Sequence, residues 1–436
     1  MQRKRRFFSA ILLAYFGIMI IGTGCDFNKE TSSSMSESEQ SVSQSSSIKE
    51  EEVSSSSFVD GTEELTIGMN YIVNGDRQSY SAMWNGPCNE KEINIPSIYN
   101  DLPVTSISDN AFSNCNAVEN IIIPDSVIKI GDNAFYNCSN LLSIEMPNSV
   151  VTLGNSTFRD CTALEEVHIS DNLTTIKDWT FFNCCNLKSV NIPNSVTLIG
   201  DLAFYGCNSL TSIKVDEDNI AYKSIDGNLY KKDGKTLIQY AIGQATKEFI
   251  IPSGVELIVR EAFSGAINLT KVVIGDNVTS IEYEAFDSCE NLTSVSIGER
   301  VAVIGEWVFS NCNNLANITV DENNATYKSI DGNVYSKDTK VFIQYAVGKK
   351  ESIFTVPDGV TSIGSNAFWA CNFLANIKLP DSITEIREYA FYGCSSLANI
   401  TFEGTVKRWK EIDKGSYWKQ NAPVKKVVCT DGTVAL

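Results

Sequence analysis

The feature that most constrains the fold is a 23-residue period that runs through most of the chain. Phenylalanine recurs at this spacing in three blocks, which are separated by two gaps of 59 residues. Each gap equals one period plus an insert of 36 residues. A fixed period of this length is typical of a solenoid, in which short coils stack on one another. The ten positions are Phe112, Phe135, Phe158, Phe181, Phe204, Phe263, Phe286, Phe309, Phe368 and Phe391.

The coil around each phenylalanine has a fixed pattern, which is clearest at residues 125–147. Val127 to Ile130 alternates apolar and polar residues and predicts a short strand. Phe135 and Cys138 mark a tight turn or a 3₁₀ segment, and a second alternating strand then ends at Pro147, which has no amide donor. One coil cannot bury its apolar side alone, whereas stacked coils can. We therefore expect a repeat solenoid, mostly β with short 3₁₀ or α turns, in which each phenylalanine packs on the next.

This unit resembles the BspA-like class of leucine-rich repeats, which reads S-V-T-x-I-G-x-x-A-F-x-x-C-x-x-L-x-x-V-x-I-P. The resemblance covers residues 92–403 in ten copies, and Ala266 is a departure at the cysteine position. The tail around Trp409, Ile412 and Trp418 is similar to that family's C-terminal cap. The resemblance implies a right-handed superhelix and a bacterial surface protein, since many members are implicated in adhesion to host proteins or to other cells.

The N-terminus has the pattern of an export signal. Arg3 to Arg6 is basic, Phe7 to Ile21 is apolar, and Gly22 to Cys25 is a run of small residues. This pattern predicts a signal peptide over residues 1–24. The end resembles a bacterial lipobox, which implies lipidation of Cys25 and attachment to the outer face of a bacterial membrane. That pattern has leucine where Gly22 stands, so an uncleaved apolar anchor is the alternative.

Composition divides the rest of the chain. Residues 31–57 hold 14 serines and few apolar residues, so residues 25–58 are expected to form a disordered stalk. An N-terminal cap is expected over 59–91, the repeats over 92–403 and a C-terminal cap over 404–436. The inserts, near 216–252 and 321–357, are predicted to be β-hairpins, because Asp233-Gly234 is a strong turn signal. They either carry binding function or extend the solenoid wall.

Charge and histidine content exclude several functions. The formal net charge is −18, so the chain repels nucleic acid. His168 is the only histidine, which rules out a histidine metal triad, and it is expected to point outward from a strand. Asp216, Asp218 and Asp321 do not fit an EF-hand loop and are expected to be surface turns, with weak calcium binding as the alternative. No nucleophile elbow or Walker A loop is present in the sequence, so we expect no cofactor, no metal and no catalysis.

The cysteines follow the period. Nine of the 13 lie three residues after a repeat phenylalanine, whereas Cys88, Cys185 and Cys429 do not. We expect an interior ladder of free buried thiols, with disulfides between neighbouring rungs as the alternative. The nine are Cys115, Cys138, Cys161, Cys184, Cys207, Cys289, Cys312, Cys371 and Cys394.

An aromatic row supplies the candidate binding site. Aromatic residues directly follow five of the ten repeat phenylalanines, at Tyr136, Phe182, Tyr205, Trp369 and Tyr392. Such side chains anchor protein interfaces and also stack on sugars, and packing along the convex side of the solenoid is the alternative. We therefore expect a non-catalytic adhesion module that binds other proteins, such as host extracellular or cell-surface proteins, or glycans. A structural spacer and an enzyme are the alternatives.

Overall fold

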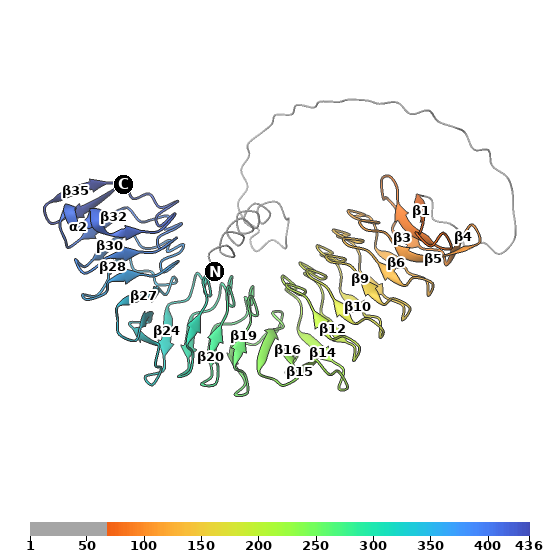
Figure 1. Ribbon diagram of the computed structural model, residues 1–436, viewed down its shortest axis with the longest axis horizontal. Helices are drawn as coiled ribbons and strands as arrows, with labels where there is room; N and C mark the ends of the chain where they lie inside the picture. Colours follow the sequence, from red (N-terminus) through yellow and green to blue (C-terminus); the bar gives the residue numbers. More distant parts are fainter. Residues whose placement is uncertain (1–67) are drawn as a thin grey trace, which may run out of the picture.

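The computed structural model describes residues 68–436, and the expected signal segment, Cys25 and stalk lie outside these residues. The described chain winds into a stack of coils that forms an open arc, from β1 (Met69–Val73) at one end to β35 (Gly432–Ala435) at the other (Figure 1). Within residues 68–436 the only α-helix is the short α2 (Val406–Glu411). No helix in this range combines the length and apolarity needed to cross a membrane. The expected repeat solenoid is thus confirmed.

One strand of each coil forms a column of parallel strands, here called face A. Where regular coils follow one another, neighbouring strands that pair do so 23 residues apart, as Val190 does with Ile213. The column of paired strands is interrupted at each insert. Side chains alternate as the sequence predicts, since Ile144 is buried and Glu145 is exposed. The strands of face A are β3 (Glu92–Asn94), β6 (Asn120–Ile122), β8 (Ser143–Glu145), β10 (Glu166–His168), β12 (Ser189–Ile192), β14 (Ser212–Val215), β18 (Glu248–Ile250), β20 (Lys271–Ile274), β22 (Ser294–Ile297), β24 (Asn317–Val320), β28 (Ile353–Thr355), β30 (Asn376–Leu379), β32 (Asn399–Phe402) and β34 (Lys426–Cys429).

A second column of shorter strands, face B, precedes each turn. Pairing is again parallel with a 23-residue offset between regular coils, as between Ile107 and Ile130. The strands of face B are β5 (Leu102–Ile107), β7 (Lys129–Ile130), β9 (Thr152–Leu153), β11 (Thr175–Ile176), β13 (Leu198–Ile199), β17 (Thr236–Gln239), β19 (Leu257–Ile258), β21 (Ser280–Ile281), β23 (Val303–Ile304), β27 (Val341–Gln344), β29 (Ser362–Ile363), β31 (Glu385–Ile386) and β33 (Asp413–Lys414).

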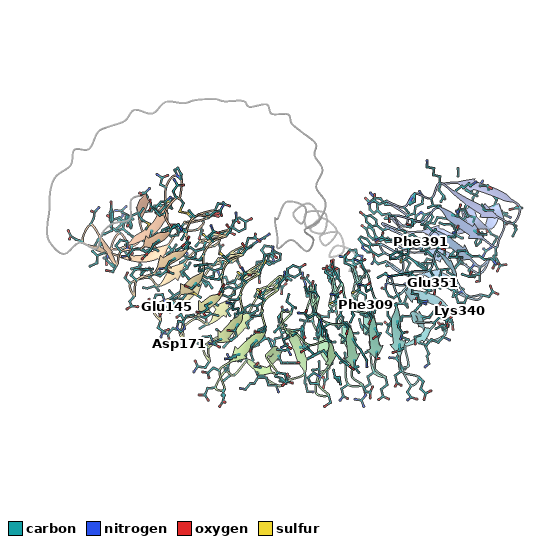
Figure 2. All side chains as sticks on the ribbon, turned by 180° about the vertical axis from the view of Figure 1, so that it is seen from behind. Glu145, Asp171, Phe309, Lys340, Glu351 and Phe391 are labelled. Atoms are coloured by element: carbon teal, nitrogen blue, oxygen red, sulfur yellow. A yellow bond between two sulfur atoms is a disulfide. The ribbon has the colours of Figure 1, made fainter. Side chains whose placement is uncertain are left out.

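The turns centred on the repeat phenylalanines form a third column, here called the turn edge. Their hydrogen bonds have 3₁₀ spacing, as from the Cys138 amide to the Phe135 carbonyl. Residues two positions before and two after each phenylalanine have left-handed backbones, with φ of 54° at Asn133 and 55° at Asn137. These residues reverse the chain twice and stop each turn from extending into a helix. Figure 2 shows Phe309 and Phe391 nearer the inner side of the arc than Glu145.

The phenylalanine rings stack inside the turn edge as predicted. Phe181 is fully buried, and its ring centroid lies 5.6 Å from that of Phe158 and 5.7 Å from that of Phe204. The rings are inclined by only 6° and 8° to these neighbours. Such offset stacking adds to the burial of each ring. Adjacent coils, whose stacked rings are here called rungs, therefore contact each other directly through their aromatic side chains.

The two inserts correct the expectation of one uninterrupted phenylalanine stack. The predicted hairpin is present, because β15 (Tyr222–Ile225), β16 (Asn228–Lys231) and β17 pair antiparallel in that order. However, β17 then pairs in parallel with β19, so the insert ends as a further coil of the solenoid. Tyr240 supplies its ring, 5.0 Å from that of Phe263. The ring that stacks on Phe263 from this side is thus Tyr240, where we expected Phe204.

The second insert repeats this arrangement. Strands β25 (Tyr327–Ile330), β26 (Asn333–Ser336) and β27 pair antiparallel, and β27 pairs in parallel with β29. Tyr345 supplies the ring of this coil, 5.2 Å from that of Phe368. Both inserts therefore extend the wall of the solenoid and add one rung each.

The cysteine ladder is present, with one correction. Cys138 and six further ladder thiols lie 2.9–3.2 Å from the carbonyl oxygen of the phenylalanine one rung earlier. Eight of the nine ladder cysteines are free and buried. The exception is Cys115, which forms a disulfide with Cys88, so the ladder begins with a covalent link to the preceding segment.

Both ends of the described solenoid are covered by antiparallel strands. Strand β1 pairs with β2 (Tyr80–Trp84), and β2 pairs in parallel with β5 and so continues face B. Strand β4 (Ile98–Tyr99) pairs antiparallel with the first residues of β5. At the opposite end β35 pairs with β34, and α2 buries Trp409 against Phe402. These elements shield the outermost apolar coils from water.

Candidate functional site

The aromatic row lies on the turn edge, and its five side chains are all half-buried. The structure gathers them into two clusters, one in the coils before the first insert and one around the second insert. Small or polar residues occupy the same position in the coils between Tyr205 and Trp369, namely Ala241, Ser264, Asp287, Ser310 and Ala346. The row is therefore not a continuous exposed strip but two aromatic patches with small and polar residues between them.

The N-terminal cluster is organised around Arg159. Arg159 stands at the position of the aromatic row in the coil between those of Tyr136 and Phe182. Its guanidinium lies 5.8 Å from the ring centroid of Tyr136 and 4.8 Å from that of Phe182. It also lies 5.6 Å from the ring of Trp179. Phe182 in turn stacks on Tyr205 with a centroid distance of 4.9 Å. The cation thus bridges aromatic rings of the two coils that flank its own.

The C-terminal cluster contains more rings. Trp369 stacks on Tyr392 at 4.3 Å, and Tyr389 stacks on Tyr417 at 5.5 Å. Trp307 lies 5.6 Å from Trp369 and 6.1 Å from Tyr389, and links the two stacks. Exposure rises through the cluster, from 6% at Trp307 to 54% at Tyr417. The cluster thus forms an aromatic surface rooted in the solenoid interior.

Five members of these clusters were not predicted from the sequence, namely Arg159, Trp179, Trp307, Tyr389 and Tyr417, and three of them share one position in the repeat. Trp179, Trp307 and Tyr389 each lie two positions before a repeat phenylalanine and have left-handed backbones, with φ of 58°, 55° and 56°. The 23-residue period could have indicated these three residues, because the position that they share lies beside the aromatic row in every regular coil. Arg159 was missed because only aromatic residues were sought.

A carboxyl cluster lies between the aromatic clusters. Glu261, Glu284 and Asp287 belong to two adjacent coils, and burial is the main cause that raises the pKa of each carboxyl. The pKa of Glu284 rises to about 8 and that of Asp287 to about 6, since neighbouring carboxylates add to the effect. Desolvation and the charge of Asp287 also raise the pKa of Tyr205. These groups hold protons at a higher pH than ordinary carboxyl groups.

The remaining candidates do not belong to the aromatic clusters. His168 is exposed on face A, as predicted. Asp216 and Asp321 accept hydrogen bonds from the amides of Asp218 and Asn323, so both acidic turns are closed by the chain itself. In residues 68–436 no group of three or more histidine, cysteine or acidic residues is arranged to hold a metal ion. Cys25 lies outside the described residues, so its lipidation stays a prediction.

Comparisons with known proteins agree with the fold. The model of the BspA type leucine rich repeat region matches six copies over residues 82–228, 242–344 and 348–421. A leucine-rich repeat protein from Eubacterium ventriosum has a TM-score of 0.59 at 22% identity, covering 83% of this chain and 94% of its own. The pneumococcal vaccine antigen PcpA has a TM-score of 0.52 at 18% identity, covering 83% and 98%.

A third structure, a leucine rich cell surface protein from Faecalibacterium prausnitzii, is 27% identical over 80% of this chain and 96% of its own, with a TM-score of 0.47. No curated protein matches the chain.

Proposed function

Because the chain belongs to the family of BspA-type leucine-rich repeat proteins, we propose that it is a non-catalytic adhesion module of a bacterial cell surface. The observation that carries this proposal is the pair of aromatic clusters on one edge of the solenoid. Tryptophan, tyrosine and arginine are the residues that contribute most often to binding energy at protein interfaces. Trp369, Tyr392 and Arg159 offer these groups at fixed positions on a stacked scaffold.

The geometry of the clusters favours a macromolecular partner. The two clusters are separated by several coils, each rising by about 4.8 Å, so one partner must be large to contact both. Their rings are held by stacking, so little side-chain freedom is lost on binding. A host extracellular or cell-surface protein fits this arrangement.

The test measures binding of the full-length protein to immobilised host matrix proteins and glycans. The double variant Trp369→Ala/Tyr392→Ala is expected to weaken binding by about tenfold or more, because truncated anchor residues cost at least ~2 kcal/mol. His168→Ala is the matched control, since His168 is exposed on face A, away from the turn edge. Melting curves check that both variants stay folded.

Three outcomes would contradict the proposal. Unchanged binding in the double variant would exclude the C-terminal cluster as an anchor. Loss of binding in His168→Ala would place the interface on face A. If no matrix protein or glycan is retained by the unmodified protein, a structural spacer becomes the better interpretation.

Surface attachment is part of the proposal and has its own test. The basic and apolar N-terminal segment and the small residues before Cys25 support export and lipidation. Mass spectrometry of the mature N-terminus is expected to find a diacylglyceryl group on Cys25. A chain that begins with intact Met1 would instead indicate an uncleaved anchor.

A further inference from the structure

A cavity of about 270 Å³ opens where the first insert joins the regular coils. It lies beside the end of the N-terminal cluster, because Tyr205 forms part of its wall. Leu202 comes from the same coil, Gln239 from the insert, and Arg260 and Glu261 from the next coil. Pockets for drug-sized ligands enclose roughly 300–1,000 Å³, so this cavity suits a single small ring or side chain.

The insert itself creates the gap. The regular coils place a left-handed residue two positions before the ring, such as Leu202 or Glu261. In the coil of Tyr240, strand β17 leads directly to the ring, without such a left-handed residue. The residue after Tyr240 is the small Ala241, whereas Tyr205 and Ser264 occupy this position in the neighbouring coils. The turn edge is therefore thinner at this coil.

The second insert shows what closes such a gap. There Ala346 follows Tyr345, as Ala241 follows Tyr240. Trp307 and Trp369 from the flanking coils meet across this position, with ring centroids 5.6 Å apart. Trp307 corresponds in position to Leu202, and their φ angles are 55° and 56°. At the first junction Leu202 stands in place of Trp307 and Ser264 in place of Trp369, so neither tryptophan is there to close the gap.

The cavity wall carries charges of both signs. The Arg260 guanidinium lies 3.0 Å from the buried Glu261 carboxylate and 3.5 Å from that of Asp201, and Glu282 accepts a hydrogen bond from the Arg260 amide. Lys231 lies over the ring of Tyr222. Three carboxylates and two cations leave the wall nearly neutral, so it disfavours both strong anions and strong cations.

The same wall offers hydrogen-bonding groups beside aromatic and aliphatic carbon. Carboxylate oxygens of Asp201 and Glu282 and the side-chain oxygen of Gln239 are acceptors, whereas Arg260 and Lys231 are donors. Acceptors outnumber donor side chains, which suits a ligand that carries several hydroxyl groups. Tyr205 and Leu202 supply the apolar surface that the carbon face of such a ligand requires.

We propose that this cavity binds one neutral sugar residue. This ligand goes beyond the macromolecular partner proposed above, and its binding does not depend on the C-terminal cluster. The hydroxyl groups of the sugar donate to Asp201, Glu282 and Gln239, and its carbon face packs on Leu202 and Tyr205.

The test uses saturation-transfer NMR on the full-length protein with the methyl glycosides of glucose, galactose, mannose and N-acetylglucosamine. At least one is expected to bind saturably at millimolar concentration. Leu202→Trp introduces the equivalent of Trp307, one of the two tryptophans at the second junction, and is expected to abolish binding without unfolding the protein. Asp201→Asn/Glu282→Gln removes two charged acceptors with little change in shape and is expected to weaken binding by about tenfold.

The matched control is Glu306→Gln, because Glu306 holds at the second junction the position that Asp201 holds at the first. It is expected to leave sugar binding unchanged. The proposal is overturned if no glycoside binds, or if Leu202→Trp binds as well as the unmodified protein. It is also overturned if Nα-acetyl-lysine methylamide binds in place of every sugar, since the cavity would then accept a basic side chain of a protein partner.

Discussion

At the residue scale, the stack places phenylalanine and tyrosine in equivalent positions with different consequences. Phenylalanine fills the rung without polar atoms. Tyr345 fills the same position but buries its hydroxyl, which has no hydrogen-bond partner among the described residues. Burial accordingly raises the pKa of this phenol. An unpartnered buried hydroxyl costs free energy that a phenylalanine would not.

Tyr345→Phe is therefore expected to leave the free energy of unfolding unchanged or to raise it by up to about 1 kcal/mol. Tyr327→Phe is the matched control, because the Tyr327 hydroxyl accepts a hydrogen bond from the Ile304 amide and donates one to the Ala302 carbonyl. The control is expected to lose about 0.5–1.5 kcal/mol. Chemical denaturation measures both, and a larger loss in Tyr345→Phe than in Tyr327→Phe would contradict this account.

The carboxyl cluster predicts a dependence of stability on pH. Burial raises the pKa of Glu284 from 4.5 to about 8, so the folded protein keeps a proton that the unfolded chain releases. This contribution to stability is complete below about pH 4.5 and is lost as the pH rises to about 8. Arg260 lies near the cluster and opposes the shift only in part.

Glu284→Gln removes this titration and is expected to raise the melting temperature near pH 8 more than near pH 5. Melting curves across this range measure the difference between variant and unmodified protein. A difference that does not change with pH would show that Glu284 titrates normally.

At the element scale, the backbone at the end of each insert passes very close to the backbone of the coil that precedes the insert. Gly243 and Gly348 serve this return, because their amides donate to the carbonyls of Leu210 and Leu315. A Cβ on Gly243 would lie 2.4 Å from the carbonyl carbon of Ser209, and one on Gly348 would lie 2.1 Å from that of Asn314. Only glycine permits this approach without a backbone shift.

Gly243→Ala is thus expected to lower the free energy of unfolding by about 1–3 kcal/mol, the usual cost of forcing extra atoms into a packed site. Gly254→Ala is the control, because its nearest neighbour would lie 3.8 Å away. Denaturation midpoints compare the two variants. Equal midpoints would show that the backbone of the insert yields easily.

The sequence predicted the elements that repeat locally and missed those that depend on space. The strands and the phenylalanine turn repeat the same pattern in each coil, so one copy predicts all. Tyr240 and Tyr345 could have been recognised as rungs, since each lies 23 residues before a repeat phenylalanine. The pairing of Cys88 with Cys115 could not, because sequence does not determine which cysteines meet.

The candidate site, too, was predictable from the sequence only in part. The aromatic row was visible in the period, but its separation into two clusters depends on Arg159 and Trp307 reaching across neighbouring coils. The cavity depends on a gap that Leu202 does not fill, and a one-dimensional pattern does not reveal such a gap.

At the scale of the whole molecule, stability should come from contacts between neighbouring coils. The buried apolar side chains form two core clusters that meet within the first insert. Tyr222, Leu229 and Ala241 belong to the N-terminal cluster, whereas Tyr230 and Tyr240 belong to the C-terminal one. In such a solenoid, the interaction energy between two rungs depends on whether they touch. Rungs on opposite sides of the first insert should therefore contribute independently.

A double-mutant cycle tests this claim most directly. Phe158→Leu and Phe181→Leu alter stacked rings 5.6 Å apart, whereas Phe158→Leu and Phe286→Leu alter rings in different clusters. Chemical denaturation is expected to give an interaction energy of at least about 0.5 kcal/mol for the first pair, and additive effects within about 0.3–0.5 kcal/mol for the second. Equal interaction energies for the two pairs would contradict the stacked solenoid.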